Sequence, residues 1–226
     1  MIIRQNKQSK TVLSSGFILV ACCALLAPAI KLSFIVGSFF TFFSIKNCIV
    51  PLSGAFGGIL GSFILCLFRL VIGASGTGIC SLKIVALYVP GLFGSLYWAS
   101  KSAIIRVLLP ATCMALFLIH PIGAAAYAYS FFWLIPIALY FIPNKTIFFE
   151  SLGSTYTVHA VGSVIWLYTV GMTPTAWLGL IPLVFIERTL FAIGMTATHS
   201  IVSRIATMST SKIHHVLVTR NIPSCN

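Results

Sequence analysis

The segment from Thr175 to Arg204 constrains the fold of this chain most, because it is long and apolar yet carries Glu187 and Arg188 near its middle. A helix of this length can cross a bilayer, which needs about 20 apolar residues. A charge at the centre of such a helix costs roughly 2.5–3.5 kcal/mol, so it normally faces a bundle interior or a water-filled cavity. The segment therefore predicts a membrane helix in a bundle, with a polar site beside it.

The composition indicates that the membrane is the solvent of this chain. Hydrophobic residues make up 59% of the 226 residues and charged residues only 7%, too few to cover a water-facing surface. Only two acids, Glu150 and Glu187, occur against 14 Lys and Arg. The basic residues are scattered between apolar runs, which argues against nucleic-acid binding and fits the positive-inside rule.

The cysteine pattern argues against a metal or disulfide framework. The seven cysteines lie mostly inside apolar runs and form no CxxC pair, so we interpret them as buried apolar side chains. Two acids and no HExxH motif leave too few ligands for a metal hydrolase. We therefore predict no metal site and no cofactor.

Eight apolar runs predict an all-α fold, a polytopic transmembrane bundle of six to eight helices, several of them kinked by proline. We expect a cytoplasmic N-terminal segment over residues 1–11, a single transmembrane domain over 12–204 and a cytoplasmic tail over 205–226. The runs cover residues 12–30, 32–45, 48–72, 79–99, 103–121, 124–142, 149–170 and 175–204.

The first two runs leave alternatives open. The first follows a basic segment, as in a signal peptide or signal anchor, and contains the lipobox-like LVAC at Leu19–Cys22; because no hydrophilic domain follows, we expect an uncleaved span. Residues 32–45 fall short of the ~20 residues that a perpendicular crossing needs. They form a short crossing, a re-entrant piece, or part of one long helix broken at Pro28.

Glycines in the third run predict close helix packing. In PLSGAFGGILGS, Gly54 and Gly58, then Gly57 and Gly61, are four residues apart and share a helix face. This spacing is typical of the small-xxx-small contacts of membrane helices. A further glycine-rich stretch, GASGTG at residues 73–78, predicts a loop.

Polar residues inside the runs are the candidate site residues. The seventh run carries His159 and Trp166 in a stripe of polar and small side chains, which must face inward. The histidine either satisfies a neighbour by hydrogen bonding or acts as a ligand or proton group. The predicted substrate-binding residues are Arg69, Lys83, His159, Trp166 and Arg188.

The two adjacent charges are expected to have different roles. Neighbouring residues on a helix point about 100° apart, so Glu187 and Arg188 cannot both be centred on one face. Arg188 shares its side with Thr196 and His199 and is predicted to meet the solute. Glu187 is predicted to form a structural ion pair with a neighbouring helix, through Arg69 or Lys83.

The distribution of basic residues predicts the topology. If all eight runs cross, Lys31, Arg69 and Lys83 lie towards the outside, and both termini are cytoplasmic. We expect the cell membrane, the inner membrane of a bacterium, and a cationic, outward-opening cavity for a small anionic or polar solute. The cytoplasmic side then receives Arg4, Lys7, Lys10, Lys46, Lys101, Arg106, Lys145, Arg204, Lys212 and Arg220.

In its size, and in PLSGAFGGILGS and STYTVHAVGSVIW, the stretch from Ile45 to Ile201 resembles the substrate-binding S components of energy-coupling factor transporters. Those are integral membrane proteins of about six helices that capture vitamins. The resemblance implies a small-solute transport or substrate-capture component that works with a membrane coupling subunit and two ATPases. This chain has no GxxxxGK[ST] motif with which to hydrolyse ATP itself.

Two alternatives remain. GASG, at residues 73–76, and HAVG, at residues 159–162, are similar to the serine and histidine motifs of rhomboid proteases, with Ser75 as nucleophile and His159 as base. No histidine that could belong to an oxyanion helix precedes Ser75, since the first histidine of the chain is His120. We therefore expect no enzyme. The other alternative is a structural or assembly protein of the membrane, in which the pair Glu187 and Arg188 only helps packing.

Overall fold

The computed structural model describes residues 2–26, 46–77 and 82–220, and within them the side chains of residues 12–26, 48–75 and 87–209. The described chain is helical without strands, which confirms the all-α class for these residues. Residues 32–45 and Pro28 lie outside the described residues. The elements are α1 (Ile2–Leu26), α2 (Lys46–Ile49), η2 (Val50–Leu52), α3 (Ser53–Thr77), α4 (Leu82–Ala99), η3 (Ile104–Leu108), α5 (Leu109–Ile119), α6 (Pro121–Ala125), η4 (Tyr127–Trp133), α7 (Leu134–Tyr140), α8 (Ile147–Thr169), α9 (Pro174–Gly179) and α10 (Ile181–Arg220).

Two stretches are long and apolar enough to cross a membrane, Val50–Ser75 and Ile181–Ser209. Shorter apolar helices cover Val12–Leu26, Ile104–Ile119 and Tyr127–Tyr140. Length and composition thus give two candidate membrane spans among the described residues, and a bundle of six to eight crossings stays a prediction.

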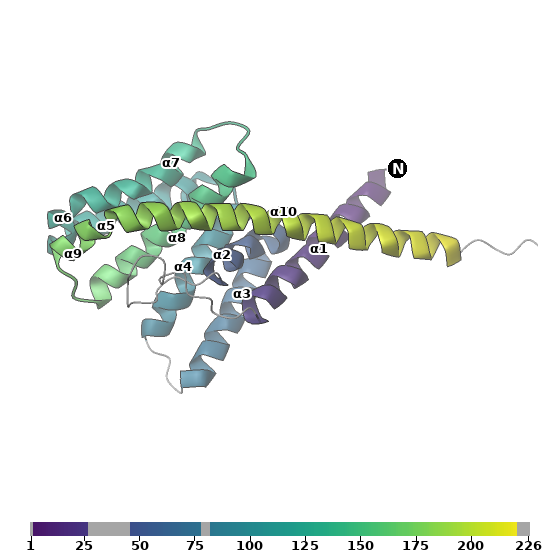
Figure 1. The fold of residues 1–226 in the computed structure, drawn as a ribbon, viewed down its shortest axis with the longest axis horizontal. Helices are drawn as coiled ribbons and strands as arrows, with labels where there is room; N and C mark the ends of the chain where they lie inside the picture. Colours follow the sequence, from purple (N-terminus) through teal and green to yellow (C-terminus); the bar gives the residue numbers. More distant parts are fainter. Residues whose placement is uncertain (1, 27–45, 78–81, 221–226) are drawn as a thin grey trace, which may run out of the picture.

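The predicted span over residues 175–204 consists of two helices, α9 and α10. Thr173 caps α9 by accepting a hydrogen bond from the backbone nitrogen of Ala176 at 3.3 Å. Pro182 lies in the first turn of α10, where its missing N–H removes no helical hydrogen bond. Glu187 and Arg188 therefore lie in the second turn of a new helix. This helix runs along the bundle, crosses α1 and continues beyond it (Figure 1).

Helix α3 is broken at Gly58, which differs from the predicted shared face of Gly54 and Gly58. The φ of +61° and ψ of −159° at Gly58 are accessible to glycine almost alone, and Ser62 Oγ donates to the Gly58 carbonyl oxygen at 2.8 Å. Gly54 lies against the backbone of Ser95 in α4, where a Cβ would overlap the carbonyl group. Helix α3 then continues to Thr77, so the predicted loop over residues 73–78 is helical as far as it is described.

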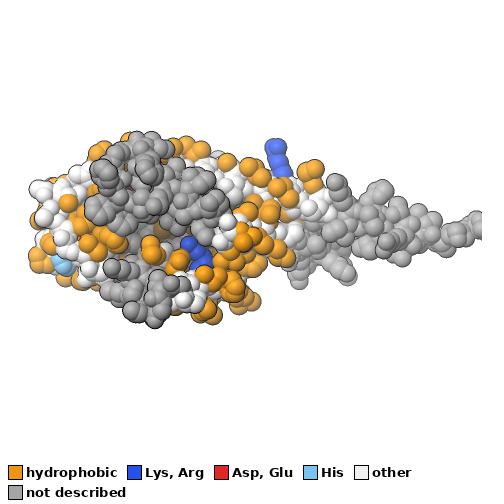
Figure 2. Space-filling view, turned by 60° about the horizontal axis from the view of Figure 1, so that its bottom comes forward, with side chains coloured by type: hydrophobic (Ala, Val, Ile, Leu, Met, Phe, Trp, Pro, Cys, Tyr) orange, Lys and Arg blue, Asp and Glu red, His pale blue; other side chains and the backbone are white. Residues whose placement is uncertain are grey.

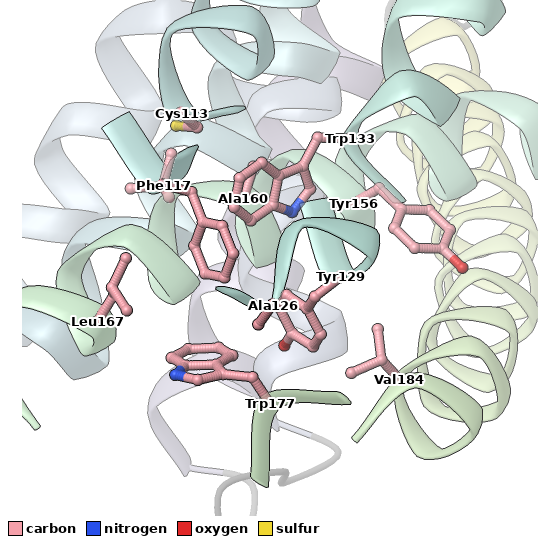
Figure 3. Close-up of a cluster of buried hydrophobic side chains, with 11 residues drawn as sticks. Cys113, Phe117, Ala126, Tyr129, Trp133, Tyr156, Ala160, Leu167, Trp177 and Val184 are labelled. Carbon is pink, nitrogen blue, oxygen red and sulfur yellow. The ribbon is translucent and has the colours of Figure 1, made fainter. Parts of the chain in front are cut away.

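Helix α8 lies at the centre of the bundle and packs against α4, α5, α7 and α10. Its apolar residues contact a cluster of aromatic rings from α5, η4 and α9 (Figure 3). Within this cluster, Tyr129 and Trp177 have ring centroids 4.9 Å apart, and the edge-to-face pair of Phe117 and Trp133 is separated by 5.1 Å. A second core joins α1, α2, η2, α3 and α10 around Val20, Cys48, Leu52, Phe56, Phe191, Met195 and Val202.

The described surface is apolar, and many polar side chains lie inside. Figure 2 shows hydrophobic side chains over much of the described part of the face that it draws. The bundle interior meanwhile holds Arg69, Arg106, His159, Glu187 and Arg188. An apolar exterior of this extent is typical of a surface that contacts lipid or a partner protein. On α3 the exposed large apolar residues are Ile59, Leu60, Phe63, Ile64, Leu67, Phe68, Val71 and Ile72.

Candidate functional site

A group of buried polar side chains lies where α8 and α10 pack together, with η4 beside them. Residues 155, 156 and 159 lie on one side of α8 because positions three and four apart are neighbours on a helix. All of the side chains in the group are buried. We call the group the Arg188 cluster, and it consists of Tyr129, Thr155, Tyr156, His159, Glu187 and Arg188.

Arg188 occupies the middle of this cluster. Its Nη1 is 3.5 Å from Thr155 Oγ1, and its Nη2 is 3.8 Å from Glu187 Oε2. The guanidinium carbon lies 4.8 Å from the centroid of the Phe191 ring, a cation–π distance. The guanidinium also lies close enough to His159 to interact with it electrostatically. The structure thus brings together Arg188 and His159, two of the predicted substrate-binding residues.

Within the cluster, Tyr156 Oη, His159 Nε2 and Glu187 Oε2 are buried and have no hydrogen-bond partner among the described residues. The His159 ring lies among aromatic rings, with centroids 5.4 Å from Tyr129 and 6.4 Å from Tyr156. In Figure 3 the Tyr156 hydroxyl points away from the ring cluster of Trp133 and Trp177. Since an unsatisfied buried polar atom costs about 1–3 kcal/mol, these atoms can bind a polar group that enters the cluster.

The ion pair of Glu187 differs from the predicted one. Its described partner is Arg188, whereas Arg69 lies over the Tyr88 ring, 4.7 Å from the centroid, and makes no ion pair with Glu187. The long arginine side chain bridges the 100° between neighbouring positions on α10, so the two residues make contact although they point to different faces of the helix. The side chain of Lys83 lies outside the described residues.

Thr196 and His199, which were predicted to share the helix face of Arg188, contact residues outside the Arg188 cluster. Thr196 donates from Oγ1 to Ser151 Oγ at 3.1 Å. The His199 ring stacks between Phe56 and Trp98, with centroids 5.2 and 5.3 Å away. This face of α10 therefore points inward, as predicted, but its residues contact several different helices and do not form one site.

The remaining predicted site residues lie apart from the cluster. Trp166 packs against the aromatic core and donates from Nε1 to Met172 Sδ at 3.2 Å. Ser75 is exposed in the last turn of α3, and its hydroxyl donates to the Val71 carbonyl oxygen at 2.8 Å. His159 lies among the aromatic rings between α8 and α10, and the described contacts of the two residues do not join them.

Sequence reasoning missed a second ion pair, between the buried Arg106 and the half-buried Glu150. Arg106 Nη1 donates to Glu150 Oε1 at 3.0 Å, and Nη2 is 2.7 Å from Oε2. The guanidinium also donates to the carbonyl oxygens of Tyr97 and Ser100, at 2.8 and 3.0 Å. The scarcity of acids was the signal that could have indicated this pair. The chain has only two acids, so an arginine that needs a carboxylate partner must take Glu150 or Glu187.

Lys145, in the loop between α7 and α8, lies beside this second pair. Its Nζ donates to the Tyr140 carbonyl oxygen at 3.3 Å. Partial burial and the nearby positive charge of Arg106 lower the pKa of Lys145, while Glu150 opposes the shift. The pair therefore sits at a basic end of the bundle.

Within the described residues, no three His, Cys, Asp or Glu side chains gather to hold a metal ion. In comparisons with known proteins, no family model, no curated protein and no solved structure matches this chain.

Proposed function

We propose that this chain is a multi-pass integral membrane protein that captures a small solute at the Arg188 cluster, as the substrate-binding component of a transport system. One observation carries the proposal. The cluster holds a charge pair on a helix apolar enough to cross a membrane, together with buried polar atoms of Tyr156, His159 and Glu187 that have no described hydrogen-bond partner. Intramembrane charges of this kind are expensive and commonly mark solute or ion pathways.

The second ion pair, between Arg106 and Glu150, offers a comparison within the same molecule. Arg106 donates to one oxygen of Glu150 at 3.0 Å and lies 2.7 Å from the other, so both oxygens are in close contact with the guanidinium. The Nη2 atom of Arg188 instead lies 3.8 Å from Oε2 of its acid, Glu187. The difference supports a binding role for Arg188 over a packing role.

The proposal includes a setting in the cell membrane with both termini cytoplasmic. A membrane coupling subunit and ATPases would supply the energy, as the resemblance to S components implies. The contacts of Ser75 and His159 give no support to a serine protease, because the Ser75 hydroxyl is directed back onto its own helix.

Ligand-induced thermal stabilisation of the purified protein in detergent tests the proposal. A panel of small anionic, zwitterionic, cationic and neutral solutes, with vitamins included, is added to the wild-type protein and to Arg188→Ala. At a ligand concentration of about 100 Kd, binding stabilises the folded state by about 2.7 kcal/mol, so Tm should rise measurably. We expect at least one solute to raise the Tm of the wild type and not that of Arg188→Ala.

Arg204→Ala is the matched control, since Arg204 is an exposed arginine on the same helix. It should keep the wild-type response. The proposal is abandoned if no solute in the panel stabilises the wild type, or if Arg188→Ala responds as strongly as the wild type does.

A further inference from the structure

Positive charge collects at the end of the bundle that holds the ion pair of Arg106 and Glu150. Lys145 lies close enough to Arg106, Lys101 and Glu150 to interact electrostatically with each of them. This group, which we call the Lys145 cluster, therefore has three cations against one acid, an excess of two positive charges. The other acid of the chain, Glu187, belongs to the other ion pair and does not offset the excess.

We propose that the Lys145 cluster binds the phosphate of an anionic phospholipid, whose acyl chains lie along the apolar side chains beside the cluster. This inference rests on the membrane setting of the function proposed above, but not on the capture of a solute.

The ion pair ties together the two connections that carry the lysines. Arg106 Nη1 donates to Glu150 Oε1 at 3.0 Å, in the first turn of α8. Nη2 and Nε of the same guanidinium donate to the carbonyl oxygens of Tyr97 and Ser100, at 2.8 and 3.0 Å, where α4 ends. The chain just after α4 and the chain just before α8 are therefore held next to each other. Cations on connections that are already fixed lose less freedom when an anion binds.

Both lysines keep hydrogen-bond donors for a ligand. Lys145 Nζ donates to the Tyr140 carbonyl oxygen at 3.3 Å, which uses one of its three N–H bonds. Lys101 is exposed, and its ammonium group makes no hydrogen bond or ion pair with the described residues. A phosphate beside the two lysines accepts from them and offsets the repulsion between the positive charges.

The surroundings of the cluster favour a lipid over a free anion. Phe141, Ile142 and Ile147, in and beside the connection that carries Lys145, are large apolar side chains exposed on the surface. Ile104, close to Lys101 in the chain, is exposed as well. Lysines beside exposed apolar and aromatic side chains are typical of the level where headgroups meet acyl chains.

The predicted topology gives a separate argument for an anionic lipid. It places Lys101, Arg106 and Lys145 on the cytoplasmic side, because both termini are expected there. The cytoplasmic leaflet carries a negative surface potential that attracts basic residues close to the membrane. The cluster therefore lies on the side where its ligand is expected to be abundant.

Lipid titrations of the purified, delipidated full chain in neutral detergent test the proposal, and native mass spectrometry counts the bound lipids. Phosphatidylglycerol is compared with phosphatidylcholine, whose headgroup is zwitterionic, and with diacylglycerol, which lacks the phosphate, all with the same acyl chains. We expect the first phosphatidylglycerol to bind about tenfold more tightly than either, a difference of about 1.4 kcal/mol. Equal binding of the three lipids would overturn the proposal.

The headgroup alone separates a lipid site from a site for free anions. Glycerophosphoglycerol has the headgroup of phosphatidylglycerol without its acyl chains, and it should bind far more weakly than the complete lipid. If it binds as tightly as phosphatidylglycerol does, the cluster takes free anions and the lipid proposal fails.

Paired variants locate the site. Lys101→Gln with Lys145→Gln removes both lysine charges and should abolish the preference for phosphatidylglycerol, whereas Lys101→Arg with Lys145→Arg should keep it. Both positions lie in connections between helices, so the fold should tolerate either pair. Arg204→Gln with Lys212→Gln is the matched control, because it removes the same charge from α10.

The control pair should keep the wild-type preference. An unchanged preference in the glutamine pair at positions 101 and 145 would show that the lipid binds elsewhere. An equal loss in the control pair would show that only the net charge of the chain matters. Either result would overturn the proposal.

The outcomes also separate this inference from the function proposed above. A loss of lipid preference leaves solute capture at the Arg188 cluster standing, since that function is tested with other ligands and another variant. If the chain stays in solution without detergent and binds none of the lipids, the membrane setting fails together with this inference.

Discussion

Arg106 and Arg188 are both buried beside an acid, yet their surroundings differ. Arg106 is held by two carboxylate oxygens and two backbone carbonyls at 2.7–3.0 Å. Arg188 meets Thr155 at 3.5 Å and Glu187 at 3.8 Å. The hydropathy pattern made Arg188 predictable as an inward charge, because an apolar run long enough to span surrounds it. It could not predict the partner of either arginine, since pairing between elements depends on how the helices dock.

The two acids should therefore differ in their effect on stability. Removing one partner of a closed buried pair typically costs about 3–5 kcal/mol, so Glu150→Gln should strongly lower the Tm of the purified protein. Glu187→Gln should lower it much less, because the contact that it removes is long. Thermal unfolding in detergent, with both variants side by side, measures the difference. A loss in Glu187→Gln as large as that in Glu150→Gln would show that the Arg188 pair is structural.

At the scale of elements, the apolar runs predicted helices where the structure describes them, and the errors lie at helix ends and at breaks inside the runs. Residues 175–204 were expected to form one membrane helix, but α10 begins at Ile181, with Pro182 in its first turn. The stretch around Ser75 was expected to be a loop because of its glycines, but α3 continues through it. Proline and glycine each fit two local structures, a break or a terminus, and only packing against other elements selects between them.

Glycines in and near α3 should respond differently to substitution. Gly54→Ala should be strongly destabilising, because its Cβ would overlap the backbone of Ser95, which cannot easily move. Gly58→Ala meets no neighbouring atom but forces a strained φ of +61°, at a cost of about 1–3 kcal/mol. Gly171→Ala, where a Cβ meets no atom within 4 Å, is the control and should be nearly neutral. Tm values of the purified variants check this order, and a neutral Gly54→Ala would contradict the close contact of α3 with α4.

At the scale of the whole molecule, polar side chains are inside and apolar side chains cover the described surface. Composition alone predicted this inversion, because a chain with 7% charged residues cannot cover itself with charge. Composition alone could not predict the number of membrane crossings. Length and composition support two spans among the described helices, and the prediction of more depends on the distribution of Lys and Arg between runs.

Reporter fusions test the predicted topology. Fusions after Asn144, in the loop between α7 and α8, and after Arg220, at the end of α10, should both report a cytoplasmic location. Activity of a reporter that works only outside the cytoplasm, at either position, would contradict the topology. A reversal at one position alone would point to residues 32–45 as the run that does not cross.

Helix α8 has a consequence for how the protein is made. It is not among the helices that are long and apolar enough to span a membrane. Some of its hydroxyl groups have partners on other elements, as Ser154 has on Gly94 and Thr155 on Arg188. One partner element, α4, is synthesised before α8, and the other, α10, is synthesised after it. In the proposed membrane setting, α8 would therefore wait beside the insertion machinery, or in a half-formed bundle, until α10 is made. A nascent chain that ends at Gly179 should leave α8 poorly inserted and exposed to membrane proteases, whereas the complete chain should protect it.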